Sequence, residues 1–415
     1  MRIVYLNPGG QLGGAETSLR ELLASVRNAE PDWELWLVLG EDGPLAEVAR
    51  KLGVRVWVQA FPRELARLGD TGGWRAWVGL LKAAPAAAGY ARGLARWLAQ
   101  IEPDIIHSNG FKMHLLGAWT RPRRTLLFWH IHDYVSPRRL MRRLLRPFRK
   151  SCSAAVVNSK SVAEDLAGAL PGLRIVPIYN AIDMQRFSPA GARMDLDTQA
   201  GLPPAAPGTV RVGLIATYAH WKGHKVFLDA LARLPEDLPV RGYIIGGPIY
   251  QTVGSQWTAL ELQQEAARLG LAGKVGFTGF LEDTPAAMRS LDVIVHASTA
   301  REPFGMVIIE GMACGKSVIA SQAGGAAELF VDGEDALGHP PGDAAALARQ
   351  IQRLASDGQL RSRLGNAARA VAARRFAGQR LAGELLAAYR AGGGGASGQN
   401  STIASRSSLP AVNDR

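Results

Sequence analysis

The chain has 415 residues, of which 47% are hydrophobic and 20% charged, and its formal net charge is +12. One hydrophobic core does not usually fill a chain of this length, so we expect a globular enzyme with two domains and a tail. No run of about 20 uncharged apolar residues is present, which argues against a transmembrane helix. The two cysteines, Cys152 and Cys314, are too few for a disulfide framework or a cysteine metal site.

The first ten residues read as a short strand that enters a loop. They lack the apolar core and the cleavage site of a signal peptide, so we expect a cytoplasmic protein. A positive charge of this size attracts polyanions, anionic lipid surfaces and phosphorylated small molecules alike. We expect no nucleic-acid partner, because no aromatic-interleaved basic strand or recognition motif accompanies the charge.

The segment 138–150 concentrates the charge, with seven cations and no acid, and its apolar residues recur at near-helical spacing. This pattern is typical of a basic amphipathic helix, which could hold the protein on the cytoplasmic face of an anionic membrane as a peripheral protein. An ordinary surface helix with a solvated cationic face explains it equally well. Both interpretations stay open at this point.

Short apolar runs alternate with longer helical patterns, which is typical of an α/β protein with parallel sheets flanked by helices. In the first half the expected strands are 2–6, 34–39, 54–58, 104–107, 125–130 and 154–158. In the second half they are 210–216, 241–246, 274–277, 292–296, 316–320 and 335–338. We divide the chain into a first domain at 1–187, a linker rich in proline, alanine and glycine at 188–209, a second domain at 210–375, a helix at 376–391 and a disordered tail at 392–415.

Two carboxylates flank an expected helix start between residues 301 and 315. Gly305 interrupts the chain before an apolar run, so Met306 and Val307 should offer free backbone N–H groups to a phosphate. Glu310 follows roughly 5–8 Å further along the helix at 1.5 Å per residue, where it could hold a ribose while Glu302 meets a sugar. Without further support, a solvated loop acid and a surface helix acid explain the pair about as well.

Two glycine loops each follow an expected strand. In the first, Gly13 and Gly14 could let a ligand approach the backbone, although the dinucleotide fingerprint is absent. The second contains Gly325 and Glu328, and a plain strand-to-helix turn is its simpler explanation. Loops at the carboxyl ends of parallel strands line the ligand crevice, so both should face one cleft.

Lys222 follows the expected strand 210–216, where its ammonium could neutralise a departing diphosphate. His132 ends the expected strand 125–130 and has a stronger case for a site role than His130 or His107, which lie on strands. No metal site is expected, because no loop or helix has a metal-binding pattern of aspartates or histidines.

Taken together, these motifs make residues 1–390 resemble the family 4 retaining glycosyltransferases, which have the GT-B fold of two facing Rossmann-like domains. The most specific element is the E-x7-E motif formed by Glu302 and Glu310. The other matching motifs are Gly13-Gly14-Ala15-Glu16, His132-Asp133, Asn180-Ala181-Ile182-Asp183, Lys222-Gly223, Gly246-Gly247-Pro248 and Gly324-Gly325 with Glu328.

The resemblance implies a role for each matching residue. Glu302 would contact the donor sugar, Glu310 the ribose, and the amides of Gly305, Met306 and Val307 the phosphates. Lys222 would bind the diphosphate and Gly14 would approach it from the other domain. His132 would sit near the sugar and the acceptor. The helix near residue 376 would return to the N-terminal domain.

The chain departs from the family pattern at two places. The family usually has an arginine about five residues before the lysine, and Thr217 stands there, which removes one diphosphate cation; His220 or His224 could compensate. At His296-Ala297-Ser298 the family commonly has an apolar residue and a proline before the serine. We expect little consequence from this second departure.

The resemblance implies a metal-independent enzyme without a cofactor, which moves a sugar from a UDP- or GDP-linked donor to a glycan or lipid-linked acceptor with retention of configuration. A diphosphate oxygen would accept the proton of the acceptor hydroxyl, and domain closure would exclude water. Two alternatives are a nucleotide-sugar epimerase of related fold and a non-catalytic nucleotide-sugar binding protein. Thr217 is the best argument for the second.

Overall fold

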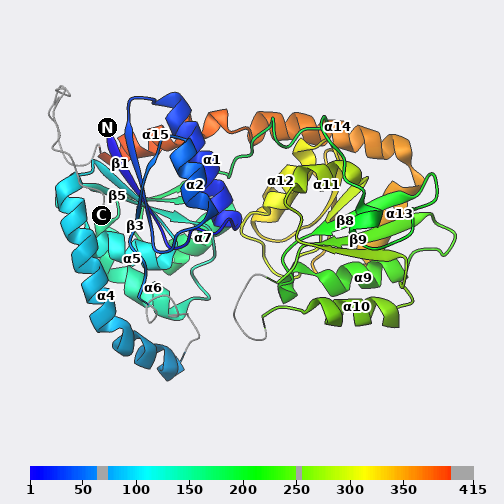
Figure 1. Cartoon of the computed structure of the whole chain (residues 1–415), viewed down its shortest axis with the longest axis horizontal. Helices are drawn as coiled ribbons and strands as arrows, with labels where there is room; N and C mark the ends of the chain where they lie inside the picture. Colours follow the sequence, from blue (N-terminus) through cyan, green and yellow to red (C-terminus); the bar gives the residue numbers. More distant parts are fainter. Residues whose placement is uncertain (63–72, 249–254, 394–415) are drawn as a thin grey trace.

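The computed structural model describes residues 1–62, 73–248 and 255–393 and contains two α/β domains side by side (Figure 1). The first domain is built on a parallel sheet of seven strands in the order β3-β2-β1-β4-β5-β6-β7. Its strands are β1 (Arg2–Asn7), β2 (Glu34–Leu39), β3 (Arg55–Val58), β4 (Ile105–Asn109), β5 (Leu126–Ile131), β6 (Ala154–Val157) and β7 (Ile175–Pro177).

The second domain is built on a parallel sheet of six strands in the order β10-β9-β8-β11-β12-β13. Its strands are β8 (Val210–Ile215), β9 (Val240–Ile245), β10 (Val275–Gly279), β11 (Val293–His296), β12 (Ser317–Ser321) and β13 (Leu337–His339). In both sheets the strand order reverses beside the first strand of the domain. Loops on either side of such a switch point form the ligand crevice of open α/β sheets.

Helices cover both faces of each sheet. Around the first sheet lie α1 (Gly14–Ala29), α2 (Pro44–Lys51), α4 (Gly73–Ile101), α5 (Phe111–Thr120), α6 (Arg139–Leu145), η1 (Arg146–Ser151) and α7 (Lys160–Ala169). The second domain contains α8 (Leu196–Gln199), η2 (His220–Lys222), α9 (His224–Ala232), α10 (Ala259–Arg268), α11 (Thr284–Ser290), α12 (Met306–Ala313), η3 (Gly325–Glu328), α13 (Ala344–Ser356) and α14 (Gly358–Arg375).

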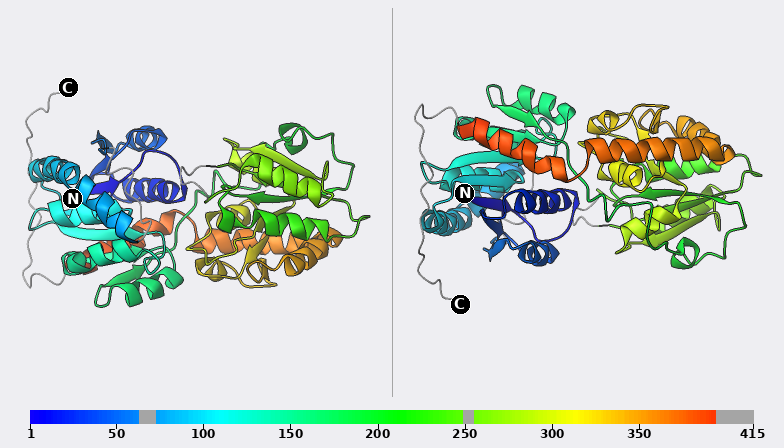
Figure 2. Two further views of the ribbon diagram at one scale, coloured as in Figure 1. Left: turned by 90° about the horizontal axis from the view of Figure 1, so that it is seen from below. Right: turned by 90° about the horizontal axis from the view of Figure 1, so that it is seen from above.

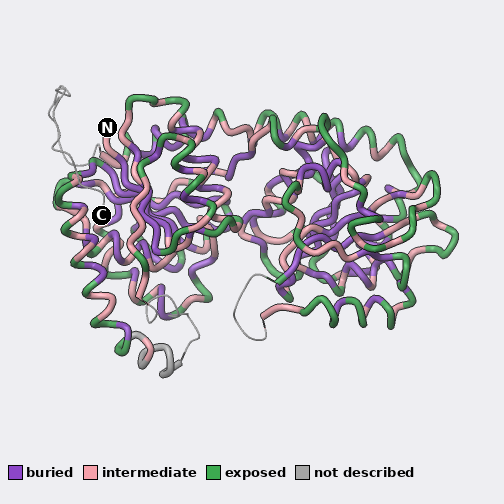
Figure 3. Tube along the Cα trace, viewed as in Figure 1, coloured by how far each residue is buried: buried purple, intermediate pink, exposed green. Residues whose placement is uncertain are grey.

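The strands form the buried centre of each domain, and the outer helix faces are exposed (Figure 3). The strand β11, with the sequence Val-Ile-Val-His, is buried on both faces. This is expected for a parallel sheet between two helical layers. One apolar cluster lies on each face of each sheet.

The chain crosses between the domains twice. The first crossing lies between Ala181, which packs in the core of the first domain, and Ile182, which packs in the core of the second. Leu196, within the expected linker, also packs in the core of the second domain. At the other end α14 is followed by α15 (Gln379–Gly393), which runs back over the first domain (Figure 2). There Leu385 packs with the residues of α1, so the predicted return of the C-terminal helix is confirmed. The predicted disordered tail lies outside the described residues beyond Gly393.

The α/β class and the GT-B architecture of two parallel sheets predicted from the sequence are confirmed. The sequence missed one strand, β7, which has three residues and ends at Pro177. None of the described helices is long and apolar enough to cross a membrane.

Candidate active site

The strand order of the second sheet brings Lys222 and Glu302 together. Lys222 follows β8 and Glu302 follows β11, and these strands pair in parallel although 80 residues separate the two side chains. Lys222 Nζ lies 2.7 Å from Glu302 Oε2. Gly223 makes this approach possible, because its φ is 78° and an added Cβ would lie 1.8 Å from the Ala297 carbonyl oxygen.

The Glu302 carboxylate accepts three hydrogen bonds at one oxygen. Besides Lys222, the hydroxyl of Ser298 donates to Oε2 at 2.9 Å, and His296 Nε2 lies 3.2 Å from the same atom. Among the described residues no hydrogen bond to Oε1 is found. Glu302 itself is buried, with 7% of its surface exposed.

His296, at the second departure from the family pattern, makes a contact that the sequence did not predict. The departure from the family pattern at this position places a hydrogen-bonding ring directly against Glu302. The sequence could not show this, because the contact requires the loop from Ala297 to Arg301 to fold back onto the end of β11. The departure itself was the available signal.

The charge state of Glu302 follows from these contacts. Burial alone would raise the pKa of the carboxyl group, but the Lys222 ammonium and the hydrogen bond with His296 outweigh burial and hold the pKa well below its ordinary value. Glu302 is therefore ionised at neutral pH.

The helix α12 begins beside this carboxylate, as predicted. Its N-cap, Gly305, has a φ of 99° and an ideal Cβ position 3.6 Å from Glu302 Cγ, and no side chain caps the helix. The first-turn amides of Met306 and Val307 have no intrahelical acceptor, which makes this end of the helix suited to an anion. Glu310 follows on the same helix, where burial raises its pKa to about 7 although Arg186 and Arg20 oppose the shift.

The second glycine loop supports the backbone around Glu302. The Gly325 amide donates to the Glu302 carbonyl oxygen at 2.7 Å, and a Cβ at Gly325 would lie 2.0 Å from the Pro303 carbonyl oxygen. From the first domain, the Tyr134 hydroxyl also donates to the Glu302 carbonyl oxygen at 3.3 Å. Gly325 therefore supports the loop that carries Glu302.

Glu328 contacts the other domain. Its carboxylate accepts hydrogen bonds from the amides of Lys160 at 2.9 Å and Ser161 at 2.7 Å, so it caps the N-terminus of α7. The Tyr179 hydroxyl donates to the same group at 3.0 Å. This acid, which belongs to one of the motifs that match the family, joins the two domains in this structure.

The first domain contributes the Gly13-Gly14 loop after β1. Gly13 is the N-cap of α1, and a Cβ added to Gly14 would meet no atom within 4 Å. The packing of the protein itself therefore does not require glycine at position 14, and the space beside it is open to a ligand.

His132 lines a cavity of about 90 Å³ at the carboxyl ends of β1, β4 and β5. Its Nε2 lies 3.0 Å from Asn109 Oδ1, and burial lowers its pKa to about 4, so the ring is neutral at pH 7. Four residues that line the cavity each have a buried polar atom without a hydrogen-bond partner: Asn7 Oδ1, Asn109 Nδ2, His130 Nδ1 and His132 Nδ1. Unpaired buried polar atoms are uncommon and indicate a water or a ligand.

Thr217 lies after β8, and its hydroxyl oxygen is buried without a hydrogen-bond partner. Neither suggested substitute for the missing arginine is well placed. His224 is fully buried and burial lowers its pKa to about 4, so it is neutral, while the ring of His220 lies 4.1 Å from that of Trp257.

Gly246 and Asn180 have structural contacts. A Cβ at Gly246 would lie 2.1 Å from the Ala216 carbonyl oxygen, so this glycine lets the end of β9 approach the segment before Thr217. Asn180 accepts a hydrogen bond from Ser18 at 2.8 Å and contacts the Met306 sulfur, which links α1 to the start of α12.

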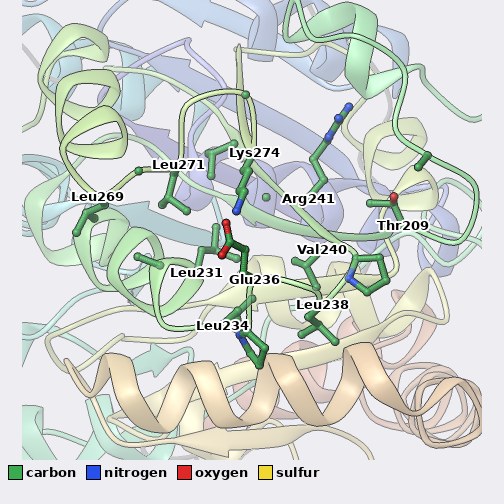
Figure 4. A pocket seen from close by; sticks show the side chains of 18 residues that line it. Thr209, Leu231, Leu234, Glu236, Leu238, Val240, Arg241, Leu269, Leu271 and Lys274 are labelled. Atoms are coloured by element: carbon green, nitrogen blue, oxygen red, sulfur yellow. The ribbon is translucent and has the colours of Figure 1, made fainter.

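Another cavity, of about 460 Å³, lies at the opposite, amino edge of the second sheet (Figure 4). Leucine side chains line it, and Glu236 and Lys274 point toward each other across it. None of the predicted site residues lines this cavity. The described residues also contain no group of three or more metal-ligating side chains that could hold a metal ion.

Comparison with known proteins identifies the family. Residues 12–186 match Glycosyltransferase Family 4 and residues 206–371 match Glycosyl transferases group 1. The chain is 30% identical over 348 residues to the phosphatidyl-myo-inositol mannosyltransferase of Mycobacterium tuberculosis, covering 78% of this chain and 86% of that protein. The chain belongs to the family 4 glycosyltransferases.

Other members of the family match over shorter stretches. The D-inositol 3-phosphate glycosyltransferase of Streptomyces bingchenggensis is 32% identical over 227 residues, which are 51% of this chain and 47% of that protein. The chain spans about half the length of this relative, and also about half the length of the glycosyltransferase LpsE of Rhizobium meliloti and of a D-inositol 3-phosphate glycosyltransferase of Catenulispora acidiphila.

A solved structure shares the whole architecture of this chain. Anabaena HepE in complex with UDP-glucose superposes with a TM-score of 0.74 at 28% identity, over 93% of this chain and 98% of that one. The similarity covers both domains.

Proposed function

We propose that this protein transfers a sugar from a nucleoside diphosphate sugar to a hydroxyl group of a glycan or a lipid-linked acceptor in the synthesis of a cell-surface polysaccharide or glycolipid. The observation that carries the proposal is the 2.7 Å contact of Lys222 with Glu302 beside the uncapped start of α12. A cation, a helix N-terminus and an ionised acid at one point suit a diphosphate joined to a sugar.

In the proposed site each group has one role. The amides of Met306 and Val307 and the Lys222 ammonium hold the diphosphate, Glu310 accepts the ribose hydroxyls, and Glu302 Oε1 accepts a hydroxyl of the donor sugar. The UDP-glucose bound to HepE makes a UDP-linked sugar the first donor to test, with GDP-linked sugars second.

The acceptor would enter from the first domain. The cavity lined by His132 offers unpaired donors and acceptors, which suit a polyhydroxylated ring. His132 is neutral, so we assign it a hydrogen bond to the sugar or the acceptor. Gly14 leaves room for the diphosphate on the same side.

We propose that the reaction retains the anomeric configuration without a metal ion. The bond between the anomeric carbon and the diphosphate oxygen breaks through an oxocarbenium-like state, and the acceptor oxygen attacks from the same face. The departing diphosphate oxygen takes the acceptor proton, while Lys222 and the helix amides stabilise its charge.

The epimerase and the non-catalytic binding protein are less well supported. Both matched families are transferase families. Thr217 in place of an arginine removes one positive charge from the proposed diphosphate site, which does not by itself exclude transfer. Lys222 and Glu302 are both present and in contact.

A peripheral membrane contact would be electrostatic. Residues 73–150 contain fifteen lysines and arginines and three acids. The net charge of this segment is therefore +12, the same as the formal net charge of the whole chain. Leu140, Met141 and Leu145 of α6 are buried in their own domain and cannot enter a bilayer, whereas Arg143 and Arg146 are exposed. We propose that these exposed cations attract an anionic lipid surface.

The test of the function is sugar transfer from UDP- and GDP-linked sugars to lipid-linked glycans, with nucleoside diphosphate release and sugar incorporation both measured. Glu302→Gln should lose at least about 100-fold in rate, as for other preorganised polar contacts. Glu282→Gln, an exposed loop acid, should transfer like the wild type. Full activity of Glu302→Gln, or conversion of the donor to an epimer without incorporation, would contradict the proposal.

A further inference from the structure

Glu302 Oε2 is contacted by Lys222, Ser298 and His296. The proposed mechanism gives no role to His296. It is the last residue of β11 and is buried, with 4% of its surface exposed. Its Nε2 lies 3.2 Å from Glu302 Oε2 and 3.0 Å from the Ser298 hydroxyl oxygen. His339 Nε2 in turn lies 3.2 Å from the His296 carbonyl oxygen and ties the end of β11 to that of β13.

The partners of the ring fix its tautomer. An ionised carboxylate only accepts hydrogen bonds. His296 Nε2 therefore carries a hydrogen and donates a hydrogen bond to Glu302 Oε2. Nδ1 is buried and has no hydrogen-bond partner. His296 therefore acts on Glu302 as a hydrogen-bond donor through Nε2.

Lys222 has two possible binding partners, Glu302 and the donor diphosphate. In this structure its ammonium contacts Glu302 Oε2 at 2.7 Å, whereas the proposed donor requires it at the diphosphate. A chain with an arginine at position 217 would have a second cation for that group, and this chain has Thr217. If Lys222 turns to the diphosphate, Glu302 needs other donors to remain an ionised buried acid.

We propose that His296 is a positioning residue that frees Lys222 for the donor diphosphate. Together with Ser298 it holds Glu302 Oε2 after the ammonium leaves, and it keeps Oε1 directed at the donor sugar. The two departures from the family pattern, at Thr217 and His296, are thus linked: a single lysine serves the diphosphate because a histidine replaces it at the acid. This inference rests on the proposed donor site.

Binding of UDP and GDP, each without a sugar, tests this role by titration calorimetry. His296→Leu removes the donor, so Glu302 should hold Lys222 more firmly and the nucleotide should bind about tenfold more weakly, as expected for a hydrogen bond to a charged group. His296→Gln retains an N–H donor of similar reach and should bind within about threefold of the wild type. His296→Asn is a second disrupting variant, polar but too short to reach Glu302. It should also weaken nucleotide binding about tenfold, and it carries the test if His296→Leu does not fold.

The same substitution in the Lys222→Ala background separates positioning from packing. There is no lysine to release, so His296→Leu or His296→Asn should leave the nucleotide dissociation constant of Lys222→Ala unchanged. Equal weakening in both backgrounds, or no weakening in the wild-type background, would overturn the role of His296 and leave the proposed function standing. Failure of the wild-type protein to bind either nucleotide would overturn both.

Discussion

Lys222 Nζ and Glu302 Oε2 lie 2.7 Å apart, from loops that follow neighbouring strands of the second sheet. In the proposed reaction each belongs to a different part of the donor, the ammonium to the diphosphate and the carboxylate to the sugar. Their contact therefore preorganises the two groups and balances their charges.

Removing the ammonium should cost stability as well as activity. The pKa of Glu302 is held below its ordinary value, so its ionised form stabilises the fold above about pH 4.5, and this contribution is lost as the pH falls through the lower folded pKa. Lys222→Ala should lower the free energy of unfolding at pH 7 by about 2 kcal/mol. Chemical denaturation measures this. Lys225→Ala, an exposed neighbour, serves as the control, and equal stability of both variants would contradict the account.

Glu310 should set the acidic limb of the pH profile. Burial raises the pKa of Glu310 to about 7. Between pH 4.5 and pH 7 the folded protein therefore holds a proton that the unfolded chain has lost. The stability that this proton contributes is present below pH 4.5 and is lost as the pH rises to 7. The ionised form is the better acceptor for ribose hydroxyls, so kcat/KM for the donor should rise through pH 7. In Glu310→Gln this limb should be absent. Its persistence would assign the titration to another group.

Gly14→Ala should separate ligand contact from folding. An added methyl group meets no atom within 4 Å, and alanine favours a helical first turn, so the melting temperature should stay equal or rise slightly. The methyl group would occupy the proposed approach to the diphosphate, so KM for the donor should rise about tenfold. Gly223→Ala is the opposite case: its Cβ would lie 1.8 Å from the Ala297 carbonyl oxygen, and it should unfold at a lower temperature. Unchanged donor kinetics in Gly14→Ala would remove this loop from the site.

The basic surface of α6 and η1 should bind anionic vesicles in a salt-dependent manner. Each cation near such a surface contributes about 1 kcal/mol, so exchanging Arg139, Arg143 and Arg146 for glutamate should abolish sedimentation with phosphatidylserine vesicles at 0.1 M salt. A control with equal charge change exchanges three exposed cations of the second domain, Lys274, Arg349 and Arg353. Equal binding of both variants would show that the surface on α6 has no special role.

The sequence predicted the fold well because the buried parallel strands are continuous apolar runs, which need no knowledge of their neighbours. It missed β7, in which two residues are partly buried and the third, Pro177, is exposed. The proximity of Lys222 and Glu302 followed from their places after two strands, because carboxyl ends meet at one edge of a parallel sheet.

Contacts made by loops that fold back could not be predicted. His296 reaches Glu302 only because the loop after β11 reverses, and Glu328 reaches α7 because Gly325–Glu328 forms a short 3-10 turn at the junction of the domains. Both depend on tertiary geometry that residue spacing does not encode. The covered apolar face of α6 is a similar case, since its partners lie on α5 and in the core of the domain.

Nucleotide binding at Lys222 tests the central claim most directly. The thermal stability of the wild type and of Lys222→Ala should be followed while UDP, GDP and ADP are titrated. A nucleotide at a hundred times its dissociation constant stabilises a protein by about 2.7 kcal/mol, so one of them should raise the melting temperature of the wild type by several degrees. At the same concentration the shift should be much smaller in Lys222→Ala. No shift with any nucleotide, or an equal shift in both proteins, would contradict a donor diphosphate bound at Lys222 and the start of α12.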